Sequence, residues 1–332
     1  MKRDSLVVKR KLLEAEISAY SKRMKKTAQE FYGSEALVPA EQFFRILGGR
    51  GKRLRGILTM IGYEMCGGKD VQMIVQAARA MEMIHTYLLI IDDIQDKSDT
   101  RRNQPSVHKH IGEPLAINAA LFGQHAAQMT LANLLVSDEQ KVAVLNILNR
   151  TMVATVHGQT KDLVFSQNHT ATPEEVELMY RHKTAEYTFL NALHTGMVLA
   201  GADCHDTDAI TDFAIHAGIA YQIKNDLKAL HSLQTAQDDI VGGKHTLVIA
   251  HAMVTLSPGD KKQLLAILGS DLSKKSYQDC IALLTAAGSI SFASERASWH
   301  TTMAEKALNK QSSRWPTSYL TFLQGIVEDF SK

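Results

Sequence analysis

The sequence predicts an all-helical protein. Apolar residues recur mainly with helical spacing, runs that alternate apolar and polar residues are few, and only six prolines interrupt 332 residues. Neither a low-complexity linker nor a short repeat divides the sequence, so we expect one helical domain over residues 1–332. The expected helices cover residues 8–32, 36–47, 52–66, 70–96, 113–135, 138–166, 173–200, 206–233, 243–255, 258–269, 276–287 and 289–309.

Glycine and proline mark the ends of these segments in chain order. The breaks fall at Gly67-Gly68, Pro105, Pro114, Pro173, Gly201, Gly242-Gly243 and Pro258. The first segment is charged and amphipathic, and the residues before it lack the apolar core of a signal peptide. We find no uninterrupted apolar span long enough to cross a bilayer and therefore expect no transmembrane segment.

Composition favours a folded globular protein, because 45% of the residues are hydrophobic and 22% are charged. A net charge of +2 gives no reason to expect nucleic acid or an anionic membrane surface as a partner. Cys66, Cys204 and Cys280 are scattered and outside any metal-binding spacing, so neither a disulfide framework nor a zinc site is expected. These features favour a reduced, cytoplasmic protein.

The motif most informative about function is an acidic run at the end of the apolar stretch over residues 81–91. In a helix, Asp92 and Asp96 lie one turn apart on one face, so both carboxylates can reach the same ions, whereas Asp93 points about a quarter-turn away. Carboxylate oxygens with open positions suit Mg²⁺, which is usually shared with phosphate oxygens of a substrate. A solvated helix end is the alternative, and the buried stretch before the motif disfavours it.

Several basic clusters are candidates for binding phosphate. Arg101 and Arg102 follow the acidic run and can form two-pronged hydrogen bonds to phosphate oxygens. The turn over residues 48–55 is rich in glycine and arginine and leads into a helix, where backbone N–H groups and cations can converge on an anion. Lys183 and Thr184 offer a cation and a hydroxyl. Each cluster alone could equally be a solvated surface.

A second apolar helix also ends in oxygen-bearing side chains. Gln222 lies three residues before Asn225, so the two lie near one another on the helix face, and Asp226 follows. The glycine-containing turn over residues 239–247 then supplies Lys244. Taken singly these features are ambiguous, but they occur in a definite order.

In that order the motifs make the chain resemble the trans-isoprenyl diphosphate synthases, also called polyprenyl synthetases, from about Phe43 to Leu308. Gly158-Gln159 with Asp162, and residues 287–290, are further landmarks of the resemblance. The matching motifs are a basic turn at residues 52–55, a DDxxD at 92–96, an arginine pair at 101–102, a Lys-Thr pair at 183–184, a QIxDD-like helix end at 222–226 and a GKxTL turn at 243–247.

The resemblance implies an isoprenoid-synthase-type helical bundle around a deep apolar cavity, usually a homodimer, with two acidic helix ends facing across its mouth. The implied enzyme is a Mg²⁺-dependent prenyltransferase that condenses isopentenyl diphosphate with an allylic diphosphate. The metal ions act as Lewis acids on the leaving diphosphate, and the dry wall keeps water from the allylic cation.

The resemblance also assigns roles to individual residues. Asp92, Asp96 and Asn225 are implied metal ligands, and the catalytic set joins them to Lys183, Gln222 and Asp226. The allylic diphosphate is assigned to Arg101, Lys183, Thr184, Gln222 and Lys244. Isopentenyl diphosphate is assigned to Lys52, Arg55, His85 and Arg102. His85 lies two helical turns before Asp92, near the same face, and a buried structural histidine is the alternative for it.

Departures from the family pattern keep two other classes of function open. The second acidic motif usually has three carboxylates, but two of its positions are Asn225 and Ala229. An amide ligand brings no charge, so a metal bound there should be held more weakly. One alternative is therefore a weakly active or regulatory subunit of a heterodimeric synthase. The other is a class I terpene cyclase, or a prenyltransferase with another acceptor, although the isopentenyl diphosphate set has no evident purpose in a cyclase.

Product length should depend on Tyr87, five positions before Asp92, where a bulky residue in this family closes the tail cavity and is typical of a product of about C20, geranylgeranyl diphosphate. On an ideal helix Leu88 lies more nearly beneath Asp92, so both positions are candidates. We expect Tyr87→Ala to lengthen the product in a chromatographic assay. An unchanged product length would contradict this assignment.

Overall fold

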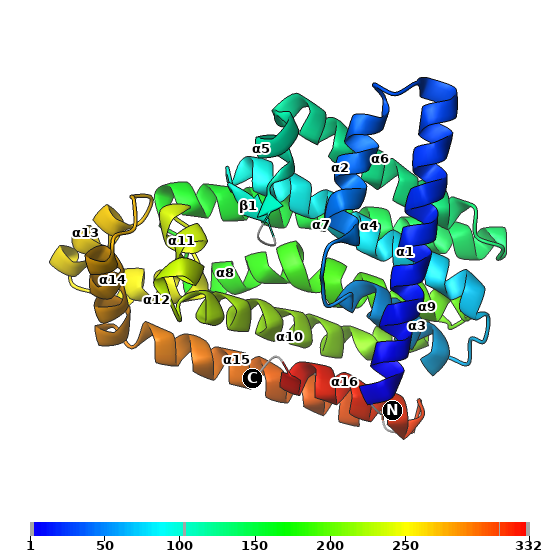
Figure 1. Ribbon diagram of the computed structural model, residues 1–332. Coiled ribbons are helices and arrows are strands. Elements are labelled where there is room, and N and C mark those ends of the chain that lie inside the picture. Colours follow the sequence, from blue (N-terminus) through cyan, green and yellow to red (C-terminus); the bar gives the residue numbers. More distant parts are fainter. Residues whose placement is uncertain (1–2, 102–103, 312, 330–332) are drawn as a thin grey trace. The chain divides into compact units, whose positions relative to one another are not determined.

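The structure, a computed structural model, describes residues 3–101, 104–311 and 313–329, and confirms the expected all-helical fold (Figure 1). The elements are α1 Arg3–Tyr32, α2 Leu37–Gly48, α3 Leu54–Met65, α4 Val71–Gln95, β1 Thr100–Arg101, β2 Gln104–Pro105, α5 Val107–Ile111, α6 Glu113–Ala132, α7 Asp138–Asn168, α8 Pro173–Tyr180, the π-helix η1 Arg181–Leu190, α9 Asn191–Leu199, α10 Cys204–Ala229, α11 Leu233–Val241, α12 Leu247–Thr255, α13 Pro258–Ile267, α14 Lys274–Ala286, α15 Ser289–Asn309 and α16 Thr317–Asp329.

The chain divides into two compact units. Unit 1 consists of Met1–Leu148 with Ala192–Thr207, and unit 2 of Asn149–Asn191 with Asp208–Lys332. Each unit is described by itself below. A single domain over residues 1–332 stays a prediction.

In unit 1, α4 packs against α3 and α6, while α2 packs against α6 and α1 against α2. Phe43, Leu58 and Met83 are fully buried in its core. A Cβ atom on Gly123 of α6 would lie 1.9 Å from the Phe43 ring, so only glycine lets the two helices approach this closely. At the start of α4, the Asp70 carboxylate accepts a hydrogen bond of 2.9 Å from the N–H of Met73 and caps the helix.

Helix α4 is the one helix among the described residues that is long and apolar enough to span a membrane. We expected no such span. In its most apolar window 67% of the residues are buried within the protein, as in the core helix of a folded domain. Its apolar character is therefore accounted for by packing inside unit 1.

In unit 2, α12 packs against α8, α14 and α15, and α15 packs against α16. Val176, Ile223, Leu247 and Leu284 are fully buried in this core. A capping box starts α8: the Thr172 hydroxyl accepts from the Glu175 N–H, and the Glu175 carboxylate accepts from the Thr172 N–H. This start fixes the beginning of the long helical segment that continues through η1.

The segment expected as one helix over residues 173–200 is helical from 173 to 199, but Arg181–Leu190 forms a π-helix. Short π segments inside helices are rare and are frequent at functional sites. The sequence pattern did not predict it, because helical periodicity does not separate the two helix types over so few residues.

Five of the described elements were not expected. The strands β1 and β2 form an antiparallel pair in which Arg101 lies opposite Gln104, and α5 follows them. Helix α10 ends at Ala229, before the expected end at residue 233, and the unexpected helix α11 follows from Leu233 to Val241. Helix α16 carried a helical signal, since Leu320, Leu323 and Val327 have the spacing of one face and are buried.

Close packing in unit 2 gives a prediction about Gly158 of α7, where a Cβ atom would lie 2.4 Å from the backbone nitrogen of Lys183. We expect Gly158→Ala to lower the free energy of unfolding by about 1–3 kcal/mol, as overpacking does, in urea denaturation. The control is Gly325→Ala in α16, where no atom lies within 4 Å of the added Cβ and stability should be unchanged or higher. Equal effects of the two substitutions would contradict the close approach.

Candidate functional site

The first acidic motif lies at the C-terminal end of α4. Asp92 and Asp96 are half-buried, whereas Asp93 is only 2% exposed. The N–H of Asp96 donates to the carbonyl of Asp92 at 2.8 Å, so the last turn is closed and the two outer carboxylates stay one turn apart. The arrangement leaves one carboxylate of the motif inside the protein and two at its edge.

The buried Asp93 is paired with Arg101 of the β1 strand. The Arg101 Nε–H donates to Asp93 Oδ1 at 2.9 Å, and a second guanidinium N–H contacts the same oxygen. Burial raises the pKa of the Asp93 carboxyl, while the bonds from Arg101 oppose that shift. Arg101 Nη2 also lies 3.7 Å from Asp92 Oδ2. Arg102, the other arginine of the pair, lies outside the described residues.

In the basic turn before α3, some of the cationic side chains are buried and others are exposed. Arg53 is 4% exposed, has the left-handed φ of 55°, and donates to the carbonyls of Leu47 and Gly49 at 2.8 Å each. Arg53 therefore holds the shape of the turn. Lys52 is exposed, and Arg55 is buried at the start of α3.

His85, Tyr87 and Leu88 of α4 are all half-buried, in contrast to the fully buried residues that precede them on the helix. The histidine is therefore not a fully buried core residue. Burial raises the pKa of the Tyr87 hydroxyl. Their roles in substrate binding and chain length stay predictions.

In unit 2, two lysines converge on one buried carboxylate. Lys183 Nζ lies 2.6 Å and Lys244 Nζ 3.3 Å from Asp162 Oδ2. Burial alone would raise the pKa of the Asp162 carboxyl, but the two ammonium groups hold it below its ordinary value. Lysines from η1 and from the turn before α12 are thus brought together by a residue of α7.

Three other candidate residues of unit 2, Thr184, Gln222 and Asp226, belong to one hydrogen-bonded chain. The Thr184 hydroxyl donates to Gln222 Oε1 at 2.9 Å, and Gln222 Nε2 donates to Asp226 Oδ1 at 2.8 Å. The Tyr180 hydroxyl donates to the other oxygen of Asp226. Burial raises the pKa of the Asp226 carboxyl to about 8, with a further contribution from Asp239, while its hydrogen bonds oppose the shift.

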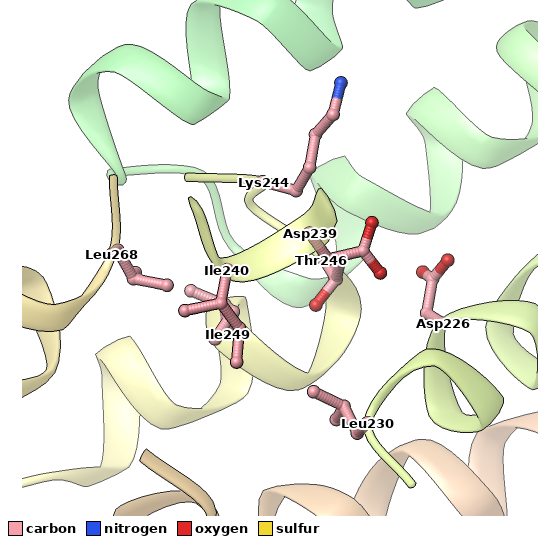
Figure 2. Close-up of a pocket in the computed structure, with 8 residues that line it drawn as sticks. All are labelled: Asp226, Leu230, Asp239, Ile240, Lys244, Thr246, Ile249 and Leu268. Atoms are coloured by element: carbon pink, nitrogen blue, oxygen red, sulfur yellow. The ribbon is translucent and has the colours of Figure 1, made fainter. Parts of the chain in front are cut away.

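Asn225, the implied metal ligand of the second motif, is exposed on α10 and so differs from its buried neighbour Asp226. Figure 2 shows Asp226 and Asp239 at the edge of a small hollow, with the Lys244 side chain pointing away from the other labelled residues. The cavity volume of the hollow is about 10 Å³, close to the volume that one water molecule needs. Its apolar residues are Leu230, Ile240, Ile249 and Leu268.

Two histidines support the turn that carries Lys244. His245 is fully buried; its Nε2 lies 2.9 Å from the carbonyl of Ala171 and therefore donates to it. The Nδ1 atoms of His245 and His169 lie 3.3 Å apart, so the His169 N–H donates to His245 when both rings are neutral. Burial lowers the pKa of both imidazoles.

Three of these residues were not assigned a role from the sequence. Asp162 was recognised only as a landmark beside Gly158-Gln159, and Tyr180 and His245 carried no signal of their own.

The carboxylates present suit Mg²⁺ that shares its coordination with a substrate. Among residues 3–101, 104–311 and 313–329, no group of three or more histidine, cysteine, aspartate or glutamate side chains could hold a metal ion by itself. Asp92 and Asp96 are hard oxygen donors at the edge of the protein, and Mg²⁺ is commonly bound through one or two carboxylates together with phosphate oxygens.

Residues 40–284 match the polyprenyl synthetase family. The short chain isoprenyl diphosphate synthase of Methanocaldococcus jannaschii is 34% identical over 241 residues, which are 70% of this chain and 72% of that protein. The chain therefore belongs to the polyprenyl synthetase family. As the resemblance implied, it is a transferase of prenyl groups.

Solved structures show the same fold. The geranylgeranyl pyrophosphate synthase of Corynebacterium glutamicum, in complex with isoprenyl diphosphate and magnesium, has a TM-score of 0.90 at 22% identity and covers 97% of this chain and 98% of its own. The geranylgeranyl pyrophosphate synthetase of Pyrococcus horikoshii has a TM-score of 0.81 at 28% identity and covers 98% and 99%.

The histidine pair predicts a loss of stability in acid. Because burial lowers the pKa of His169 and His245 below the ordinary value of about 6.5, the unfolded chain binds more protons than the folded one below that pH. The free energy of unfolding should therefore fall as the pH drops below about 6.5. His169→Asn keeps the left-handed backbone at φ 51°, which asparagine tolerates, and removes one titrating ring. In urea denaturation it should lose less stability on acidification than the wild type; an equal loss would count against the pair.

Proposed function

We propose that this prenyltransferase condenses isopentenyl diphosphate with an allylic diphosphate to make a trans-polyprenyl diphosphate of about C20, with Mg²⁺ as cofactor. The observation that carries the proposal is the convergence of Lys183 and Lys244 on Asp162, beside the Thr184–Gln222 hydrogen bond. Two partly buried ammonium groups that share one carboxylate suit a diphosphate, which carries more negative charge than Asp162 alone. The name of the Pyrococcus horikoshii structure and the half-buried Tyr87 support the length of about C20.

In this reaction the allylic C–O bond breaks, and both of its electrons leave with the diphosphate. The double bond of isopentenyl diphosphate then attacks the allylic carbon, and the departing diphosphate accepts one proton from the new cation, which restores a double bond. Lys183, Lys244, Thr184, Gln222 and Arg101 bind and orient the leaving diphosphate. The isopentenyl diphosphate is bound by Lys52, Arg55, His85 and Arg102.

Asp92 and Asp96 would hold Mg²⁺, with Asn225 as a weaker ligand. The bound metal supplies Lewis-acid stabilisation of the departing diphosphate. Asp93 is not assigned a metal, because it is buried and its Oδ1 is bound to Arg101 inside the protein. The pairing with Asp93 also orients Arg101.

We also propose that the protein is a cytoplasmic homodimer without a membrane-spanning segment. Helix α6 of unit 1 exposes Leu115, Leu121 and Met129 by 40–48% each, and an apolar surface of this kind is typical of an interface between subunits. Burial of α4 within unit 1 supports a role for that helix in the core rather than in a membrane.

A weakly active or regulatory subunit is the second candidate, and the altered second acidic motif favours it. Asn225 and Ala229 remove two carboxylates from a motif that usually has three. The complete first motif and the lysine pair favour an active enzyme. A terpene cyclase has no comparable support, since Lys52, Arg55 and His85 would lack a ligand.

The test is incubation of the purified protein with Mg²⁺, isopentenyl diphosphate and C5, C10 or C15 allylic diphosphates, followed by product analysis. Elongated diphosphates of up to about C20 are expected. Hydrocarbon products would indicate a cyclase, and turnover only after addition of another family member would indicate a partner subunit. Elution volume in size-exclusion chromatography tests the homodimer.

Restoring a carboxylate should improve metal binding. We expect Asn225→Asp to raise activity several-fold at low Mg²⁺ and little at saturating Mg²⁺, because a charged oxygen ligand binds the cation more tightly than an amide. Asn225 is exposed, so the added charge should cost little stability. The control is Asn146→Asp, which adds the same charge at an exposed position of α7. A Mg²⁺ response identical to that of the control would contradict the proposed ligand.

A further inference from the structure

Tyr180 lies where the segments that carry the proposed diphosphate residues of unit 2 meet. It is the last residue of α8, directly before η1, and is only 3% exposed. Its hydroxyl accepts a hydrogen bond of 2.8 Å from the backbone N–H of Leu247 and donates to Asp226. Leu247 is the first residue of α12, immediately after the turn that carries Lys244. One hydroxyl thus joins α8, α10 and that turn.

The donor and acceptor of each bond in this network are determined. Because the Leu247 N–H can only donate, the single Tyr180 proton is available for Asp226. The other oxygen of Asp226 accepts from Gln222, and the Gln222 carbonyl accepts from Thr184. The amide of Gln222 is thereby oriented from both ends. The network runs from Thr184 through Gln222, Asp226 and Tyr180 to the backbone at Leu247.

The same bonds use both oxygens of Asp226. Tyr180 and Gln222 each supply a proton to one oxygen, and the side chain is 7% exposed. Asp226 also borders the hollow of Figure 2, together with Lys244 and Thr246. The Asp226 carboxylate therefore connects the end of α10 to Tyr180 of α8. Asn225, the preceding residue of the same motif, is exposed.

We propose that Tyr180 is a positioning residue for the allylic diphosphate. Through Asp226 it orients Gln222 and Thr184, and through Leu247 it holds the turn that presents Lys244. The inference rests on the roles proposed above for Thr184, Gln222 and Lys244. Tyr180 itself contacts no substrate; its effect reaches the substrate through the hydrogen-bonded side chains.

The experiment compares Tyr180→Phe with the wild type in the elongation assay, with each substrate varied while the other is saturating. Phenylalanine keeps the ring and removes only the hydroxyl. The KM for the allylic diphosphate should rise about tenfold, the size of effect that loss of one buried hydrogen bond produces. The KM for isopentenyl diphosphate should change less than about twofold, because its assigned residues lie outside the network.

The matched control is Tyr277→Phe. The Tyr277 hydroxyl of α14 donates to the carbonyl of Leu230 at 2.9 Å, just beyond the end of α10. This substitution removes the same group from the same unit without touching the network. Both KM values should stay unchanged in the control, so a purely structural role for Tyr180 would make the two variants alike.

The outcomes separate this inference from the proposed function. If the wild type does not elongate an allylic diphosphate, the proposed function is wrong and the inference falls with it. If the wild type elongates and Tyr180→Phe has the KM values of Tyr277→Phe, the inference alone is overturned. Should Tyr180→Phe not fold, Asp226→Asn breaks the network with little change of size, since the amide keeps only one of the two accepting oxygens. Because Asp226 also belongs to the second acidic motif, the Mg²⁺ dependence is measured as well: a rise in the allylic KM at an unchanged Mg²⁺ dependence supports the inference, and an unchanged allylic KM or a rise that higher Mg²⁺ reverses overturns it.

Discussion

A carboxylate taken out of water must be met by positive charge or by hydrogen-bond donors, and unit 2 is organised around two such groups. Asp162 is met by two lysines and Asp226 by a tyrosine and a glutamine. Satisfying these carboxylates brings together α7, α8, η1, α10 and the turn before α12. The side chains proposed to bind a diphosphate are therefore oriented in the protein alone, and such orientation lowers the cost of ordering them on binding.

In unit 1, the charged motifs also contain buried side chains that hold the fold, beside side chains that lie nearer the surface. Arg53 holds the basic turn through two carbonyls, and Asp93 holds the strand residue Arg101, while Lys52, Asp92 and Asp96 lie nearer the surface. Within each charged motif, one member supports the fold and others remain accessible. A count of charges in the sequence cannot separate these members, because the separation depends on which side of the helix or turn is packed.

The sequence was sufficient to predict the all-helical fold and the family, because helical periodicity and the order of six short motifs are properties of the chain itself. It did not reveal the roles of Tyr180 or His245, whose importance comes from partners 46 and 74 residues away in the chain. The π-helix was also not predicted, since apolar spacing over the ten residues of this segment does not separate a π-helix from an α-helix. Asp162 was recognised from the sequence as a landmark of the family. Its contacts with Lys183 and Lys244 became known only from the structure.

The π-helix over Arg181–Leu190 determines how the two ends of one segment are rotated about their common axis. Lys183 near its start contacts Asp162, and Phe189 near its end packs against Tyr221 with ring centroids 5.9 Å apart. Over these few residues an α-helix would turn further than a π-helix, by roughly 100° in total. The side chains of Lys183 and Phe189 would then point in different relative directions from those observed. The wider turn of the π-helix sets the angle between the directions of these two side chains. One segment thereby contacts Asp162 through Lys183 and Tyr221 through Phe189.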